Sequence, residues 1–252
     1  MVIKLCATGI AMALAGAAAA DIIVTPELVQ SFSLGSSSFS GRASPNAFYS
    51  NVDTFTGAVN TNGGSTNLSG NVMTRMVVDD LTLNGAHSGL TRLTFSVSSL
   101  NAANVSARAR IRLYADDNGG QPGTLITGLT STTMTFGPGS VSLFSVTIPA
   151  VAVPGKMWAG IMFDNNGGST GAGVAELNNL GQGVFNPPNV GSSQDLYFRT
   201  SSAGSFLSNN PGGTIQSGGA GPIGNFGWEA VPTPGVGAVV TLAGLLAARR
   251  RR

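Results

Sequence analysis

Few side chains in this sequence could take part in acid–base or nucleophilic chemistry. His87 is the only histidine, and Lys156 is the only lysine after Lys4. His87 lies in Asn84-Gly-Ala-His-Ser-Gly89, which is typical of a loop, and Ser88 beside it would point away on an extended chain. A general base needs an acid partner and a nucleophile that the fold brings together. We therefore expect no catalytic residue and predict that the protein is not an enzyme.

Acidic residues are numerous enough for a glycosidase, which needs only two carboxylates. No spacing singles out a pair, and Asp79 and Asp80 should face opposite ways because they are adjacent on a predicted strand. The candidates are Asp79, Asp80, Asp116, Asp117, Asp164, Glu176 and Asp195.

Two similar segments, Asp116-Asp-Asn-Gly-Gly and Asp164-Asn-Asn-Gly-Gly, could offer oxygen ligands to calcium. Neither fits the twelve-residue calcium loop with its closing glutamate, whereas both fit a tight hairpin turn. The turn interpretation is favoured, so we expect no metal and no cofactor.

Three arginines, Arg108, Arg110 and Arg112, alternate with apolar residues from Val105 to Tyr114. On a strand they would share one face at spacings of about 6.6–6.8 Å. Such a row could contact an acidic glycan, and the three arginines are our candidate glycan contacts. The alternative is a solvated face whose neighbours supply Asp or Glu. Tyr49, Tyr114 and Tyr197 could stack on sugars, whereas Trp158 and Trp228 are expected in the core.

The elements that would position these residues are strands, because several runs alternate with a period of two and none keeps a helical period. Glycine, asparagine and proline mark turns between them, for example at Gly137-Pro138-Gly139. The sequence predicts an all-β fold, an antiparallel β-sandwich or jelly roll, as one domain over residues 21–230. Strands are expected at Val72–Val78, Leu81–Leu83, Leu93–Val97, Val105–Tyr114, Thr132–Phe136, Val141–Ile148, Met157–Phe163, Asp195–Arg199 and Asn225–Glu229, with irregular stretches at 31–70 and 200–224.

The composition points to a secreted protein rich in turns. Only 10% of the 252 residues are charged, against about 25% in an average globular protein. Lys4 and the four terminal arginines carry the positive balance; the residues between them hold 8 basic against 11 acidic side chains, a net charge of −3. This weakly acidic body argues against a nucleic-acid partner.

The N-terminal segment, positions 1–20, has the pattern of a signal peptide. A lysine precedes an uncharged apolar run, and Ala18-Ala19-Ala20 fits the small-residue rule for cleavage between Ala20 and Asp21. Cleavage would also remove Cys6, the only cysteine, so the mature chain could form no disulfide. The export machinery is the partner this segment predicts.

The C-terminal segment, positions 231–252, combines three features. Val231-Pro232-Thr233-Pro234 is followed by an uncharged apolar run from Val236 to Ala248 and then by Arg249, Arg250, Arg251 and Arg252. Thirteen residues make a helix of about 20 Å, short of the roughly 30 Å hydrocarbon core. Because basic residues stay on the cytoplasmic side, we expect a short transmembrane helix that holds an exported chain in the inner membrane transiently.

This layout resembles the PEP-CTERM sorting signal of exported bacterial proteins, whose motif is usually Val-Pro-Glu-Pro. Val231, Pro232 and Pro234 match that motif, and Thr233 stands where Glu is usual. The resemblance implies recognition by an exosortase, a membrane cysteine protease-transpeptidase, with removal of the tail. It also implies release or attachment at the surface of a didermal bacterium, often alongside exopolysaccharide. Separately, the segments beginning at Val77 and Arg112 resemble uncharacterised β-sandwich modules of surface proteins.

Taken together, these features predict an exported protein of the cell surface or extracellular matrix with a structural or adhesive role. The expected partners are the export machinery and an exosortase-like protease, with exopolysaccharide as a candidate and no nucleic acid. A carbohydrate-binding module is the alternative, and a secreted hydrolase is a third hypothesis.

Overall fold

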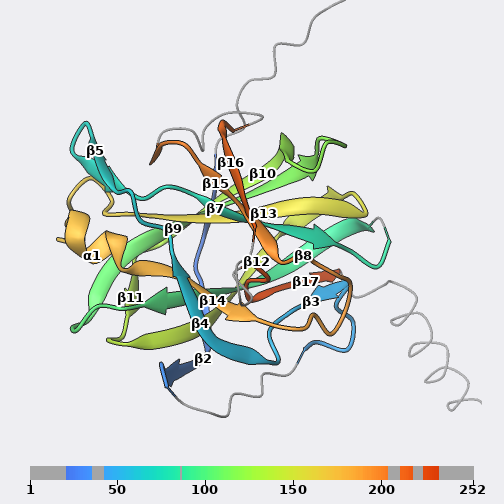
Figure 1. Cartoon of the computed structure of the whole chain (residues 1–252), viewed down its shortest axis with the longest axis horizontal. Coiled ribbons are helices and arrows are strands. Elements are labelled where there is room, and N and C mark those ends of the chain that lie inside the picture. Colours follow the sequence, from blue (N-terminus) through green and yellow to red (C-terminus); the bar gives the residue numbers. More distant parts are fainter. Residues whose placement is uncertain (1–20, 36–42, 86, 204–210, 218–223, 233–252) are drawn as a thin grey trace, which may run out of the picture.

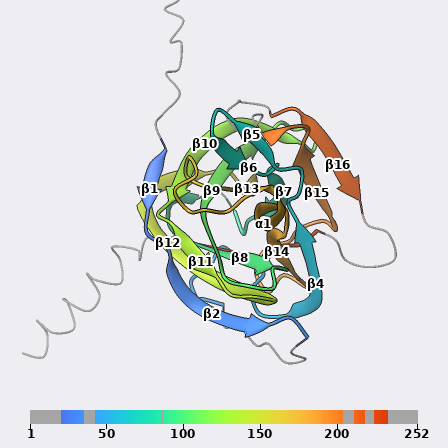
Figure 2. The ribbon, with the colours of Figure 1, turned by 90° about the vertical axis from the view of Figure 1, so that its left-hand side faces the viewer.

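The structure is a computed structural model, and it describes residues 21–35, 43–85, 87–203, 211–217 and 224–232. Over these residues the chain is nearly all β, which confirms the predicted all-β class. Two sheets, A and B, lie face to face and form the upper and lower layers in Figure 1. Viewed from the side in Figure 2, the layers curve around a common interior.

Sheet A has ten strands among the described residues. Its main path runs β1 (Ile22–Val24), β10 (Pro122–Ser131), β9 (Val105–Asp116), β13 (Lys156–Asp164), β7 (Val77–Thr82), β15 (Leu196–Thr200) and β16 (Gly213–Ser217). Off this path, β11 (Met134–Phe136) pairs with β9, β6 (Asn71–Met73) pairs with β13, and β5 (Thr66–Leu68) pairs with β6.

Sheet B has seven strands in the same described part of the chain. Its main path runs β2 (Glu27–Ser33), β12 (Ser140–Val153), β8 (His87–Ser99), β14 (Leu180–Phe185) and β4 (Phe55–Thr61). β17 (Trp228–Pro232) pairs with β8 and with the short β3 (Tyr49–Ser50). The single described helix, α1 (Val174–Asn178), lies between β13 and β14 in the sequence.

Strand pairing is antiparallel with the exception of β1 and β10, which run parallel. β1 enters sheet A from the N-terminal end of the described chain, and the chain then crosses to sheet B at Thr25 and Pro26 to form β2. β1 and β2 are adjacent in the sequence but belong to different sheets, so the connection between them is a crossover between layers and not a hairpin.

The predicted register of β9 is confirmed. Val105, Ala107, Ala109, Ile111 and Leu113 are buried in the core between the sheets, and the arginines point to the opposite face. Burial of an aliphatic side chain such as Ile111 contributes about 1.5–3 kcal/mol. The alternation therefore fixes which face of the strand carries charge.

Phenylalanines join the two layers in this core. Phe136 of β11 in sheet A makes edge contacts with Phe144 of β12 in sheet B and with Phe163 of β13, both with ring centroids 5.9 Å apart. Such T-shaped pairs stabilise a core beyond the effect of buried area alone.

Some elements depart from the sequence predictions. Val72–Val78 is not one strand but parts of β6 and β7, separated by Thr74 to Met76. Pro122-Gly123, a residue pair typical of turns, begins β10, where the first position of a strand tolerates proline. Eight of the described strands, β1 to β5, β10, β14 and β16, lie where no strand was predicted, several of them in the stretches 31–70 and 200–224 that were expected to be irregular.

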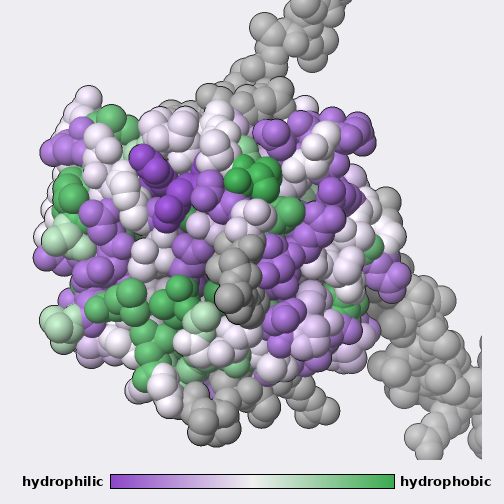
Figure 3. Space-filling view, in the orientation of Figure 1, coloured by the Kyte–Doolittle hydropathy of each residue, from purple (hydrophilic) through white to green (hydrophobic). Residues whose placement is uncertain are grey.

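Glycines in β14 allow a second apolar cluster on the outer face of sheet B. A Cβ at Gly183 would lie 2.9 Å from Val141 Cγ1 and 3.0 Å from Phe185 Cε2, so a larger residue would displace them. Phe32 of β2 and Phe55 of β4 pack against each other over this cluster, with ring centroids 5.1 Å apart. Three strands separate β2 from β4 in the order of the sheet. Figure 3 shows an apolar area near β2 and β4 in the lower left of the view.

Both predicted sorting segments fall largely outside the described residues. The predicted signal peptide up to Ala20, and Thr233, Pro234, the run 236–248 and Arg249–Arg252 are among the residues not described. Val231 and Pro232 are described, and they belong to β17 in sheet B, paired with Arg92 and Leu90. The folded domain therefore extends past the predicted boundary at Ala230, through Pro232. Within the described residues, no helix has the length and apolar character needed to cross a membrane.

Candidate functional site

The arginine row on β9 is bound to carboxylates of the same chain. Arg108 donates from Nε to Asp164 Oδ1 at 2.8 Å and from Nη2 to Oδ2 at 3.1 Å. Arg110 donates from Nε to Asp164 Oδ2. Asp164 is fully buried between them, and the two arginine side chains are about one-fifth exposed. These contacts match the alternative interpretation, in which neighbouring acids accompany the arginines.

Asp164 is ionised by this arrangement. Burial opposes the charged form, but the hydrogen bonds and positive charges of Arg108 and Arg110 outweigh it and lower the pKa of Asp164. A backbone N–H from Asn166 adds a further hydrogen bond at 2.9 Å. Asp164 thus begins its predicted turn and also holds two strands of sheet A together.

The third arginine is buried. Arg112 has a side chain only 2% exposed, and its Nη2 donates to Asp21 Oδ2 at 2.8 Å. Thr130 on β10 donates to the same oxygen at 2.6 Å. A buried guanidinium needs such a counter-ion. Arg112 therefore forms a buried ion pair. This corrects the expectation that the arginine-bearing face of β9 is solvated at all three arginines.

Both Gly-rich segments form turns, but only the first closes a hairpin, between β9 and β10. The second follows β13 and leads to α1, so the hairpin expected at Asp164-Asn-Asn-Gly-Gly is not formed. In the first, Asp117 Oδ1 accepts the backbone N–H groups of Gly119 and Gln121 at 2.7 and 2.9 Å, and these bonds lower its pKa. Asn118 and Asn166 both adopt a positive φ, as these turn positions require. No group of three or more potential metal-ligating side chains occurs in the described part of the chain.

The aromatic candidates for sugar stacking are inside the protein. Tyr49, Tyr114 and Tyr197 are at most 8% exposed, which corrects the expectation that they could present rings to a ligand. Burial raises the pKa of Tyr114 to about 12. The predicted core positions of Trp158 and Trp228 are confirmed, and Trp158 Nε1 donates to Asp116 Oδ1 at 2.8 Å. His87, expected in a loop, is instead the first residue of β8, opposite Val153.

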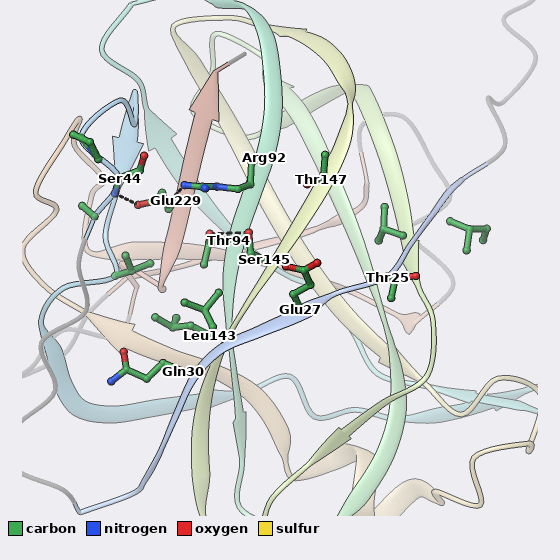
Figure 4. Close-up of a pocket in the computed structure, with 16 residues that line it drawn as sticks. Thr25, Glu27, Gln30, Ser44, Arg92, Thr94, Leu143, Ser145, Thr147 and Glu229 are labelled. Atoms are coloured by element: carbon green, nitrogen blue, oxygen red, sulfur yellow. Dashed lines mark hydrogen bonds and ion pairs between the residues drawn. The ribbon is translucent and has the colours of Figure 1, made fainter. Parts of the chain in front are cut away.

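An open groove of about 980 Å³ lies on the outer face of sheet B. Its walls come from β1 and β2, its floor from β8, β12 and β17, and one end from residues 43–45 (Figure 4). One row of paired residues crosses the floor from strand to strand: Glu27, Ser145, Thr94 and Glu229. The next row pairs Arg92 with Thr147.

Charged side chains lie on both sides of the groove floor: Arg92 and Glu229 on one side and Glu27 of β2 on the other. Arg92, with its side chain 45% exposed, lies 3.3 Å from Glu229 Oε1, and Glu229 is only 6% exposed. The second oxygen of Glu229 accepts the backbone N–H of Ser44 at 2.7 Å and the hydroxyl of Ser50 at 3.4 Å. Figure 4 shows this ion pair beside Thr94 and Ser145, whose hydroxyls are 3.5 Å apart.

The groove offers hydrogen-bonding groups beside aliphatic surface. Thr147 is exposed at the floor, and Val29 and Ile23 are 58% and 68% exposed along the β1–β2 wall. None of the described residues that line it is aromatic. No sequence pattern indicates this site, because its residues come from segments that pair only in the folded sheet. Comparison of the chain with protein-family models, with curated proteins and with solved structures found no match.

Proposed function

We propose that this chain is an exported protein of the cell surface or extracellular matrix, with a structural or adhesive and non-enzymatic role. In this proposal the β-sandwich domain performs the structural or adhesive role, and the segment that ends at Ala20 directs export. The tail is sorted by an exosortase-type protease after a transient stay in the inner membrane.

The contact that carries the proposal is the one between Asp21 and Arg112. Asp21 would be the first residue after signal cleavage, and its carboxylate neutralises an arginine buried within sheet A. The first residue of the proposed mature chain would thus be part of the fold, and no residue before it is needed for that ion pair. This position of Asp21 supports export of the two-sheet domain as a unit.

Cell fractionation tests the sorting part of this proposal. The full chain is expressed in a didermal bacterium beside a variant in which Arg249–Arg252 are replaced by serine. Moving each arginine into the membrane costs about 2.5–3.5 kcal/mol, so the wild-type tail should stop in the bilayer and the variant should not. We expect a membrane-held intermediate only for the wild type. Identical fractionation of both forms would contradict the proposed role of the tail.

The groove favours a second candidate function, a carbohydrate-binding module. Its hydroxyl floor and aliphatic wall suit the hydroxyl edges and C–H faces of a sugar chain, and Glu27 and Glu229 disfavour a strongly acidic polymer. In this alternative the groove takes the place of Arg108, Arg110 and Arg112 as the glycan contact.

Affinity electrophoresis of the purified full chain in neutral and acidic polysaccharide gels tests this alternative. The double variant Ser145→Ala, Thr147→Val should lose retardation in a neutral polysaccharide gel. Thr135→Val, which removes an exposed hydroxyl bonded to Ser106 on sheet A, is the matched control and should keep it. Equal mobility of all three proteins with and without polysaccharide would contradict the binding function.

A further inference from the structure

The hydroxyl of Ser193 contacts two carboxylates that an extended strand should keep apart. Ser193 Oγ lies 3.0 Å from Asp79 Oδ1 and 3.4 Å from Asp80 Oδ1. Adjacent residues of β7 point to opposite faces, so no side chain within either layer would reach both. Ser193 reaches both because it lies in the segment that precedes β15, the strand paired with β7. The two aspartates, expected to face opposite ways, thus contact a common group only through Ser193.

The number of protons at this contact is limited. A serine hydroxyl has one proton and can donate it to one carboxylate only. If both aspartates were ionised, the second carboxylate would face an oxygen lone pair and a neighbouring negative charge without a proton between them. Asp79 and Asp80 are 0% and 1% exposed, so water cannot relieve this repulsion. One additional proton between the two carboxylates would relieve this repulsion.

The other neighbours determine which aspartate holds that proton. Asp80 Oδ1 also accepts the backbone N–H of Gln194 at 3.1 Å, and the positive charge of Lys156 acts on Asp80. Asp79 Oδ2 accepts the uncharged backbone N–H of Phe226 at 2.8 Å. The anion is better stabilised at Asp80, and the proton therefore belongs to Asp79.

We propose that Asp79 stays protonated at neutral pH, donates to Ser193 Oγ while Ser193 donates to Asp80, and so forms a pH-sensitive latch that fastens residues 189–194 to β7.

The latched segment joins the two sheets. Ser192 exchanges backbone hydrogen bonds of 2.8 and 2.9 Å with Thr82, the last residue of β7 in sheet A, and Ser50 of β3 in sheet B donates to Val190 O at 3.0 Å. Asp79 also accepts the N–H of Phe226, just before β17. Loss of the proton would place two charges at this junction and weaken the attachment of residues 189–194 and of the entry to β17.

The pKa shifts agree with this arrangement. Burial, followed by the charge of Asp80, raises the pKa of Asp79 well above its usual value, and burial raises the pKa of Asp80. Tyr49 of β3 faces the pair, and burial together with Asp79 raises its pKa as well. Lys156 of β13 faces Asp80 and is itself 3.3 Å from Asp116 Oδ1 on β9. Lys156 therefore acts on Asp80 while it is also paired with Asp116.

The sign of the pH effect follows from the raised pKa of Asp79. An unfolded aspartate loses its proton near pH 4, whereas the folded domain keeps the proton to higher pH. Between these two values the folded state binds more protons than the unfolded state, so stability falls as pH rises. Each pH unit in that window should increase the unfolding equilibrium constant up to tenfold.

The test compares unfolding of the purified full chain from pH 4 to pH 9 with that of Asp79→Asn, Asp80→Asn and Ser193→Ala. The amide of Asp79→Asn can donate to Ser193 and accept from Phe226, which reproduces the protonated state. We expect this variant to lose the decline in stability and to exceed the wild type at the alkaline end. Asp80→Asn is the matched isosteric control, and Ser193→Ala should be weakened at every pH. Parallel curves for wild type and Asp79→Asn would overturn the proposal.

Infrared spectroscopy gives a second measurement that does not depend on variant stability. The wild type at neutral pH should show the carbonyl band of a protonated carboxylic acid, which Asp80→Asn should keep. In parallel, hydrogen exchange corrected for its intrinsic pH dependence should speed up at Ser50, Thr82 and Phe226 as the wild type is made alkaline. Absence of the infrared band in the wild type at neutral pH would also overturn the proposal.

Discussion

Asp21 Oδ2 lies 2.8 Å from the Nη2 atom of Arg112, 91 positions away in the sequence, and forms an ion pair at the edge of sheet A. The arginine is the more deeply buried partner, since its side chain is 2% exposed against 22% for Asp21. Asp21 therefore supplies the negative charge that compensates the buried guanidinium of Arg112. The same contact binds the beginning of the described chain to β9.

Removal of that carboxylate should destabilise the domain markedly. Asp21→Ala leaves the Arg112 guanidinium buried without its counter-ion, and breaking a buried pair in this way costs about 3–5 kcal/mol. We expect a loss at the lower end, about 3 kcal/mol, because Asp21 is partly exposed. Chemical denaturation measures it, with Glu27→Ala on the exposed strand β2 as control. Equal stability of the two variants would show that the ion pair contributes little.

Acid should weaken the contact between β9 and β13 through Asp164. Its folded pKa is lowered, so its contribution is present above the ordinary aspartate value of about 3.9 and is lost as pH falls through the folded value. Asp164→Asn should be less stable than the wild type at pH 7 and should approach it at pH 2. Thermal unfolding at several pH values tests this, with Glu27→Gln as control. A constant difference at all pH values would be inconsistent with an ionised Asp164.

The opposite signs at Asp79 and Asp164 define where the domain is most stable. Stability should fall toward alkaline pH as the Asp79 latch loses its proton and toward strong acid as Asp164 gains one. We expect a maximum in mildly acidic solution, and thermal unfolding across the pH range should show the position of that maximum shifted upward in Asp79→Asn. An unshifted maximum would mean that a group other than Asp79 sets the alkaline limit.

Gly191 should tolerate no side chain, because the segment beside the latch approaches Thr82 closely. Its φ is +75°, and an added Cβ would collide with the backbone oxygen of Thr82 and lie 2.9 Å from Tyr49 Cδ2. Gly120 has a similar φ of +79° with nothing within 4 Å, so Gly120→Ala carries the backbone strain alone. Gly191→Ala should therefore lower the melting temperature clearly more than Gly120→Ala. Similar losses would mean that Gly191 is required only for its backbone conformation.

Alternation of residue types predicted much of the fold, since it depends on local chemistry. The alternating pattern of β9 specified both its faces, and the turns at Asn118 and Asn166 followed from the backbone angles that asparagine and glycine accept. β14 was missed because Leu180-Gly-Gln-Gly-Val has glycines where side chains would show the alternation. The glycine at 183 is needed because Val141, Phe55 and Phe185 fill the space above it.

The ion pairs and the groove could not be predicted in the same way. Asp164 lies 56 residues from Arg108, and Ser193 lies 114 residues from Asp79, so only the strand order brings these groups together. The groove likewise depends on the row from Glu27 to Glu229, which crosses four strands. Sequence patterns could identify the charged and hydroxyl residues but not their partners.

The exact mass of the protein recovered separately from membranes and culture medium tests the central proposal most directly, because it defines both ends of the mature chain. We predict that the exported protein begins at Asp21 and that the final form has lost its tail near Pro232–Gly235. The variant with serine at positions 249–252 should begin at the same residue and keep its tail. An exported protein that retains Met1 and Arg252, with the corresponding full-length termini in the variant, would contradict the proposal.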